Sequence, residues 1–215
     1  MAVWNDEIHG YLYVAEQTGC RVRRVDRSTG IVTTFAGTGQ CVTSSSTSES
    51  SSDATSTPLN QPSGVWGDSS SSFIYISEMA AHRIRVVDVT TNQMSTISID
   101  AQLNSPTYLF IDNSNNNTTS LIVADTGNHV ICSIDLINNN GTIRTIAGTI
   151  QSSGSSGDGG PATLARLNYP MGVHMNTAAH NNNNKILFIC DPKNNKVRMV
   201  SFSSSNDGII STLAG

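Results

Sequence analysis

The fold is decided by two stretches, YLYVAEQTGCRVRRVD at residues 11–26 and FIYISEMAAHRIRVVD at residues 73–88, which align without a gap. Each stretch begins with a run of β-branched and aromatic residues and reaches an acidic residue. It then passes through a short turn and returns in a second β-branched run. Apolar runs of this length between turn residues predict two paired strands. No helical period is present, so the repeating element is a β unit.

Two further copies follow, LIVADTGNHVICSID at residues 121–135 and LFICDPKNNKVRMV at residues 187–200. A proline-containing turn and a short strand come before the last three copies, and a further strand follows each copy. Without the Ser-rich and Gly-rich inserts the period is about 45 residues, which is typical of a four-stranded β-propeller blade. We therefore predict an all-β fold with blades at about 1–37, 59–99, 103–148 and 167–215, separated by inserts at about 38–58 and 149–166.

Three segments carry a family resemblance: Ala124-Asp125-Thr126-Gly127-Asn128-His129, then Thr145-Ile146-Ala147-Gly148-Thr149, then the glycine-rich run at 157–163. They resemble the NHL-repeat β-propeller family. The resemblance implies a ring of about six blades, of which this chain supplies four. Both ends fall at the same point of the repeat. We therefore expect part of a larger ring, whose open blade edges would favour self-association.

Composition restricts the function classes. Only 13% of residues are charged and the formal net charge is −4, so no basic field attracts nucleic acid. No apolar run is long enough for a membrane helix, and the first residues lack a signal-peptide pattern. Three glycosylation sequons, at Asn116, Asn117 and Asn140, arise easily in so Asn-rich a chain and leave the compartment open.

The repeated acids Glu16, Glu78, Asp125 and Asp191 each end the second strand of a repeat. A carboxylate at that position can accept backbone amides of the following turn, so we assign these four residues to the fold. Asp158 lies in a glycine-rich insert that has neither the lysine of a P-loop nor the spaced acids of an EF-hand. That insert is predicted to be a crossover between blades, with Asp158 as its only candidate cation ligand.

Basic residues recur in the third strands, where Arg23, Arg85 and Arg198 occupy one repeat position. Their alternation with apolar residues predicts solvated or blade-edge side chains, although the family resemblance keeps an RNA-binding face as an alternative. His174 shares its first-strand position with Trp4, Trp66 and Phe110, which favours packing over metal binding. Together the arginines and His174 are the candidate binding residues.

Four cysteines, at 20, 41, 132 and 190, contain no CxxC pair, and we expect reduced, partly buried thiols rather than a disulfide. No nucleophile motif is present, and no cofactor is expected. The resemblance implies a noncatalytic scaffold whose loops bind a protein, peptide or glycan partner. The alternative is an enzyme resembling the amidating lyases or lactonase-like hydrolases, in which His174 would join acids around a channel metal.

Overall fold

A computed structural model describes residues 2–42, 52–115, 118–136, 141–176, 185–202 and 208–215. Within these ranges the protein is all-β, and the helices are three-residue 3-10 turns: η1 (Thr126–Asn128), η2 (Ala162–Leu164) and η3 (Pro192–Asn194). None of these helices is long and apolar enough to span a membrane. The predicted fold class, built from four-stranded antiparallel sheets, is confirmed in its architecture.

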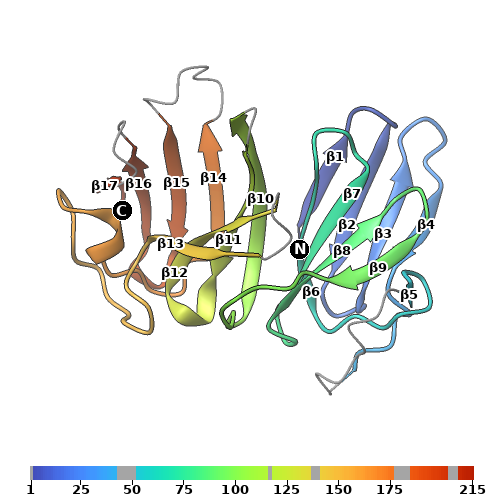
Figure 1. Cartoon of the computed structure of the whole chain (residues 1–215), viewed down its shortest axis with the longest axis horizontal. Helices are drawn as coiled ribbons and strands as arrows, with labels where there is room; N and C mark the ends of the chain where they lie inside the picture. Colours follow the sequence, from blue (N-terminus) through green and yellow to red (C-terminus); the bar gives the residue numbers. More distant parts are fainter. Residues whose placement is uncertain (1, 43–51, 116–117, 137–140, 177–184, 203–207) are drawn as a thin grey trace. The chain divides into compact units, whose positions relative to one another are not determined.

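The chain divides into two compact units, Met1–Ile97 and Ser98–Gly215, each containing two sheets (Figure 1). Unit 1 holds sheet 1, in the order β1-β2-β3-β4, and sheet 2, in the order β5-β9-β8-β7-β6. The strands of sheet 1 are β1 (Val3–Asp6), β2 (Tyr11–Glu16), β3 (Arg21–Asp26) and β4 (Val32–Ala36). Those of sheet 2 are β5 (Ser52–Asp53), β6 (Pro62–Gly67), β7 (Phe73–Glu78), β8 (Arg83–Asp88) and β9 (Gln93–Thr96).

Unit 2 repeats this arrangement in sheet 3, β10-β11-β12-β13, and sheet 4, β14-β15-β16-β17. The strands of sheet 3 are β10 (Pro106–Asn115), β11 (Thr118–Asp125), β12 (Val130–Asp135) and β13 (Ile143–Ala147). Those of sheet 4 are β14 (Gly172–Asn176), β15 (Ile186–Asp191), β16 (Lys196–Ser201) and β17 (Ile209–Ala214). All strand pairs described within the four sheets are antiparallel. The paired strands are neighbours in the sequence, except for β5 and β9.

Strand β5 is a departure from the predicted insert. Residues 38–58 were expected to be a loop, but Ser52 pairs with Met94 and Asp53 with Gln93, which gives sheet 2 a fifth strand. The corresponding insert of unit 2 meets sheet 4 through an isolated β-bridge, between Pro161 and Ile209. Proline lacks the amide that would extend this bridge into a strand, which explains the difference between the two inserts.

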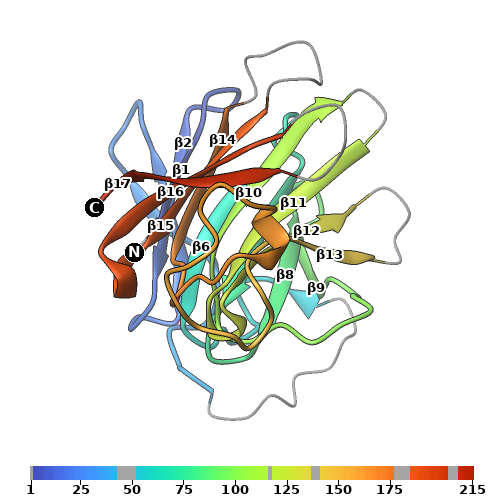
Figure 2. The same ribbon diagram turned by 90° about the vertical axis from the view of Figure 1, so that its left-hand side faces the viewer.

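Each insert fastens two sheets of its own unit through one buried alanine. In unit 1, Gly37 N–H donates to Ala54 C=O (2.8 Å), and Ala54 N–H donates to Asn92 C=O (2.9 Å). In unit 2, Gly148 donates to Ala162 (2.9 Å) and Ala162 donates to Gly208 (2.7 Å). Figure 2 shows the insert of unit 2 in orange, with η2 within it. Both inserts therefore connect the outer strand of one sheet to the outer hairpin of the next.

The glycine that follows the last strand of sheets 1 and 3 is required by the backbone. Gly37 and Gly148 have φ of +89° and +91°, and a Cβ on either would lie 2.5 Å from the carbonyl oxygen of Cys20 or His129. The turn between the second and third strands also has a left-handed residue at one position, occupied by Cys20, His82, His129 and Asn195. The repeat thus fixes backbone geometry while its side chains vary.

Candidate functional site

The repeated carboxylates fasten the loop that leads into the first strand of their own sheet. Glu78, Asp125 and Asp191 are buried at the ends of β7, β11 and β15. Each accepts a backbone N–H from an asparagine before the proline turn: Asn60 donates to Glu78 (2.6 Å), Asn104 to Asp125 (2.7 Å) and Asn168 to Asp191 (2.8 Å). Glu16, in sheet 1, is half-buried and pairs with Arg21 Nε at 2.5 Å.

The second carboxylate oxygen takes a side-chain donor. Asn128 Nδ2 donates to Asp125 and Asn194 Nδ2 to Asp191, both at 2.7 Å, whereas Arg83 Nε donates to Glu78 at 2.5 Å. Sequence analysis placed the donors in the backbone of the following turn. The donors described here are a backbone amide about twenty residues earlier in the sequence and, for Asp125 and Asp191, an asparagine side chain of the turn. These contacts support a structural role for the carboxylates, which stays a prediction.

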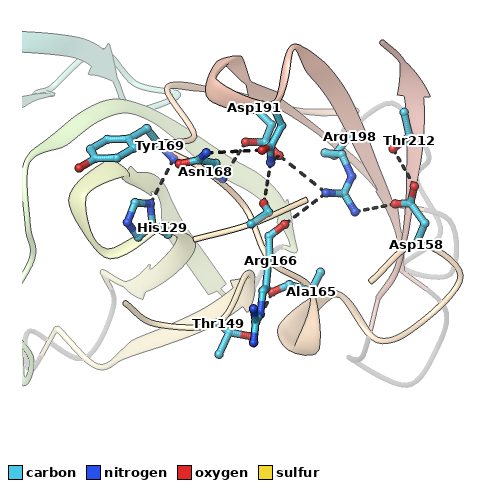
Figure 3. Close-up of polar contacts among 12 residues, drawn as sticks. His129, Thr149, Asp158, Ala165, Arg166, Asn168, Tyr169, Asp191, Arg198 and Thr212 are labelled. Atoms are coloured by element: carbon cyan, nitrogen blue, oxygen red, sulfur yellow. Dashed lines mark hydrogen bonds and ion pairs between the residues drawn. The ribbon is translucent and has the colours of Figure 1, made fainter. Parts of the chain in front are cut away.

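Arg198 lies at the centre of a charged network in unit 2 (Figure 3). Its side chain is fully buried, and Nη2 donates to Asp158 Oδ1 at 2.5 Å. Nη1 lies 3.7 Å from Asp191 Oδ2 and donates to the Arg166 carbonyl at 3.4 Å. Of the two predicted environments, solvated or blade-edge, the solvated one is therefore wrong for Arg198 and for Arg85, which is also fully buried.

Asp158 binds a guanidinium in this structure. One carboxylate oxygen accepts from Arg198, and the other accepts from Thr212 Oγ1 at 2.7 Å. Partial burial raises the pKa of Asp158, but the hydrogen bonds from Thr212 and Arg198 outweigh that effect and leave the pKa below its ordinary value. Among the residues described, no three His, Cys, Asp or Glu side chains gather into a metal-binding group.

The remaining candidate residues, Arg23 and His174, belong to different units. Arg23 is half-buried in sheet 1 and donates from Nε to the Thr33 carbonyl at 3.3 Å. His174 is exposed on β14 and meets the Phe110 ring edge-on, with 5.2 Å between ring centroids. Arg23 and Arg85 belong to unit 1, and Arg198 and His174 belong to unit 2. The sequons at Asn116, Asn117 and Asn140 lie outside the described residues.

The expectation of reduced thiols is wrong for two of the cysteines. Cys20 and Cys41 form a disulfide with a Cα–Cα distance of 5.2 Å. Cys132 and Cys190 are free, and burial raises the pKa of the Cys132 thiol to about 12. Disulfides persist mainly in oxidising compartments. The cysteine spacing gave no sign of this pair, because Cys20 and Cys41 meet only through the fold of the first insert.

Three loops of unit 2 are held together at one place. Gln151 N–H in the insert donates to Asn128 C=O (2.9 Å), and Tyr169 N–H donates to His129 Nδ1 (3.2 Å). The Tyr169 and His129 rings meet edge-on at 4.6 Å, as Figure 3 shows. Thr149 Oγ1 also donates to Ala165 C=O at 3.0 Å. The turn at 126–129, the insert at 149–166 and the loop at 167–171 thus form one loop surface, which we call the unit 2 loop surface.

Large apolar side chains are exposed on this surface. Their exposed fractions are 59% for Ile150, 73% for Leu164, 46% for Tyr169 and 51% for Met171. Sequence analysis missed these residues. The available signal was that Tyr169 occupies the position of Gln61 and Ser105 in the equivalent loops, where a polar residue is ordinary. Exposed apolar side chains on loops that contact one another are a feature of partner-binding sites.

Comparison with known proteins defines the class. No protein-family model matches the sequence. Among solved structures, the chain resembles auxiliary nutrient binding proteins from Bacteroides thetaiotaomicron (TM-score 0.61, 18% identity, 92% of this chain and 46% of that one) and Bacteroides ovatus (TM-score 0.62, 17% identity, 100% and 57%). A protein of unknown function from Bacteroides thetaiotaomicron gives a TM-score of 0.64 at 15% identity, over 100% of this chain and 46% of that one. The fold is that of β-propeller blades, and the chain spans about half the length of these proteins.

The repeats resemble those of a protein with NHL repeats. Over 96 residues the chain is 33% identical to human NHL repeat-containing protein 2, a match that covers 44% of this chain and 12% of that protein. The resemblance recognised in the sequence is therefore confirmed.

Proposed function

We propose that this chain is a noncatalytic binding domain whose unit 2 loop surface takes a protein, peptide or glycan partner. The observation that carries this proposal is the exposure of Ile150, Leu164, Tyr169 and Met171 on three loops that hydrogen bonds hold together. A rigid sheet scaffold that presents loops is a common basis for binding. Two structural neighbours are named as nutrient binding proteins, which agrees with a binding role.

The RNA-binding alternative loses its main support. It depended on Arg23, Arg85 and Arg198 forming a basic face, and two of these three guanidinium groups are buried in ion pairs. A phosphate backbone needs accessible cationic side chains. The enzyme alternative has no cluster of ligands among the described residues that favours it over binding. A larger ring and self-association through open blade edges remain proposals.

The test is a ligand screen with matched variants. The wild-type chain is screened against a glycan array and a displayed peptide library, and each ligand found is titrated against Leu164→Ser, Tyr169→Asn and Ile31→Ser. Asparagine is chosen at 169 because this residue has φ of +54°, which asparagine tolerates. Ile31 is the control, since it is 61% exposed but lies in unit 1.

We expect Leu164→Ser and Tyr169→Asn each to weaken binding by about tenfold or more, which corresponds to about 1.4 kcal/mol. Ile31→Ser should leave the affinity unchanged. Ligands whose affinity falls with Ile31→Ser and not with the two unit 2 variants would refute the proposed surface.

A further inference from the structure

The repeat does not require the exposed apolar side chains of the unit 2 loop surface. Unit 1 builds the same loops, since Ala54 and Ala162 make matching backbone hydrogen bonds in the two inserts. Counted from these alanines, the unit 1 residues at the corresponding positions are small or polar: Ser56 for Leu164, Gln61 for Tyr169 and Ser63 for Met171. The apolar side chains are therefore an addition of unit 2 to a shared loop structure.

Two exposed cations accompany these apolar side chains. Arg166 ends the insert, and its side chain packs on Gly154, where an added Cβ would lie 2.9 Å from Cδ of Arg166. Lys193 lies in η3, whose Asn194 Nδ2 donates to the Gly154 carbonyl at 2.6 Å. Both cations are exposed, and neither forms an ion pair with a carboxylate of the described residues. The corresponding residues of unit 1 are uncharged: Pro58 for Arg166 and Ala80 for Lys193.

The carboxylates near these cations are already engaged. Asp158 is the one acidic residue in the sequence of the unit 2 loop surface and the η3 turn, and its two oxygens accept from Arg198 and Thr212. Asp125 and Asp191, at the strand ends, are buried, and each accepts a backbone amide and an asparagine side chain. The exposed charges that a ligand meets at these loops are therefore positive.

We infer that the partner of the unit 2 loop surface is an acidic peptide that carries apolar side chains, an inference that rests on the proposed function. The apolar side chains of the peptide pack against Leu164, Tyr169 and Met171, and its carboxylates pair with Arg166 and Lys193. Methionine, arginine and aromatic residues are enriched where proteins bind one another, and the flexible side chain of methionine adapts to different apolar partners.

The same residues fit a glycan or a nucleic acid less well. The hydroxyl groups of a glycan placed against Ile150, Leu164 and Met171 would lose water without gaining a hydrogen-bond partner. A nucleic acid is held by many phosphate contacts, whereas this surface offers two exposed cations on a chain with a formal net charge of −4. An acidic peptide uses both the apolar side chains and the two cations.

The experiment selects peptides from a random displayed library on the full 215-residue chain. The peptide that binds most tightly is then synthesised in two versions, the selected sequence and a neutral one in which every Asp and Glu is changed to Asn and Gln. Both versions are titrated against the wild type, the double variant Arg166→Gln with Lys193→Gln, and Arg144→Gln. Arg144 is the matched control because it is an exposed arginine of unit 2 on β13, outside the loop surface.

We expect the selected peptides to be richer than the library in acidic and in large apolar residues. Neutralising the peptide, or neutralising both cations of the protein, should weaken binding by about three- to tenfold, as two exposed ion pairs do. The neutral peptide should bind the wild type and the double variant equally, and Arg144→Gln should bind as the wild type does. The advantage of the acidic peptide should shrink in about 0.5 M salt, because salt screens exposed charges.

The inference is overturned if the selected peptides are not enriched in acidic residues, if the two peptide versions bind equally, or if only glycans are recovered as ligands. The two peptide versions are compared on an unchanged protein, so they decide the question even if the double variant does not fold. The proposed function survives each of these results as long as Leu164→Ser and Tyr169→Asn weaken the ligand that is recovered. A ligand that responds to neither variant refutes the binding surface itself.

Discussion

The two units fasten the same turn by different chemistry. In unit 1 the left-handed residue of the turn is Cys20 (φ +47°), and a disulfide joins it to Cys41 in the first insert. In unit 2 the equivalent residue is His129 (φ +61°), whose ring accepts a hydrogen bond from Tyr169 and contacts the Tyr169 ring. The backbone geometry is preserved, whereas the link between loops is covalent in one unit and noncovalent in the other.

This difference suggests how one repeat supports both stability and binding. The disulfide of unit 1 restrains its insert whatever side chains the insert carries. The loops of unit 2 are restrained by hydrogen bonds around His129 and Asn128, and they expose apolar side chains. We therefore expect unit 2 to depend on its polar contacts for stability and unit 1 to depend on its disulfide.

The largest effect is expected from Asp191→Ala in unit 2. This change removes the acceptor for Asn168 N–H and one of the two carboxylates near buried Arg198. Breaking a buried ion pair costs about 3–5 kcal/mol. Asp125→Ala is the matched control, because its repeat carries Cys132 in place of the arginine and should lose only about 1–3 kcal/mol. Equal losses in denaturant melts would show that Arg198 does not depend on Asp191.

A somewhat smaller effect is expected from removing the disulfide of unit 1. Cys20 and Cys41 are 21 residues apart, and closing a loop of this length stabilises a fold by about 3 kcal/mol. The double variant Cys20→Ser with Cys41→Ser should lower the stability of unit 1, as seen by hydrogen exchange of β2 and β3. Amides of β11 and β12 in unit 2 serve as the control. Equal loss of protection in both units would contradict the expectation that the disulfide stabilises unit 1 and not unit 2.

The smallest effect is expected in acid, from the loss of the Asp53 contacts in unit 1. Hydrogen bonds from Thr55 and Asn92, followed by backbone amides, lower the pKa of Asp53 from 3.8 to about 2. Because the folded pKa is below the unfolded value, the stabilisation is present above about pH 4 and is lost as the pH falls toward 2. The residue equivalent to Asp53 in unit 2 is Pro161, which does not titrate. Carbon-13 NMR of the Asp53 carboxyl group measures the midpoint, and a value near 3.8 would refute the contacts described.

Sequence reasoning predicted the repeat because strand pairing depends on local patterns. Four copies of alternating β-branched residues gave the sheets, and the glycines at 37 and 148 marked the end of the fourth strand. It failed where a residue's environment is set by distant segments. Arg85 and Arg198 were assigned to the surface because each alternates with valine, isoleucine or methionine along its strand. The available signal was Cys132, since an uncharged residue at the same repeat position indicates an interior site.

The candidate site was less predictable for the same physical reason. The donors to Asp125 and Asp191 come from a backbone amide and a turn side chain that only the folded sheet brings together. The disulfide joins Cys20 to an insert whose sequence contains no recognisable pattern. The exposed side chains on the unit 2 loop surface depend on three loops that lie together only in the folded unit.

The central claim is that the repeated carboxylates hold the fold while the unit 2 loop surface binds the partner. The most direct measurement takes one ligand from the screen and determines both its dissociation constant and the melting midpoint for Asp125→Asn and Tyr169→Asn. We predict that Asp125→Asn lowers the midpoint with an unchanged dissociation constant below the melting transition. Tyr169→Asn should raise the dissociation constant about tenfold or more and lower the midpoint less than Asp125→Asn does, because the backbone N–H that donates to His129 is kept. An unchanged melting curve for Asp125→Asn together with lost affinity would contradict the account.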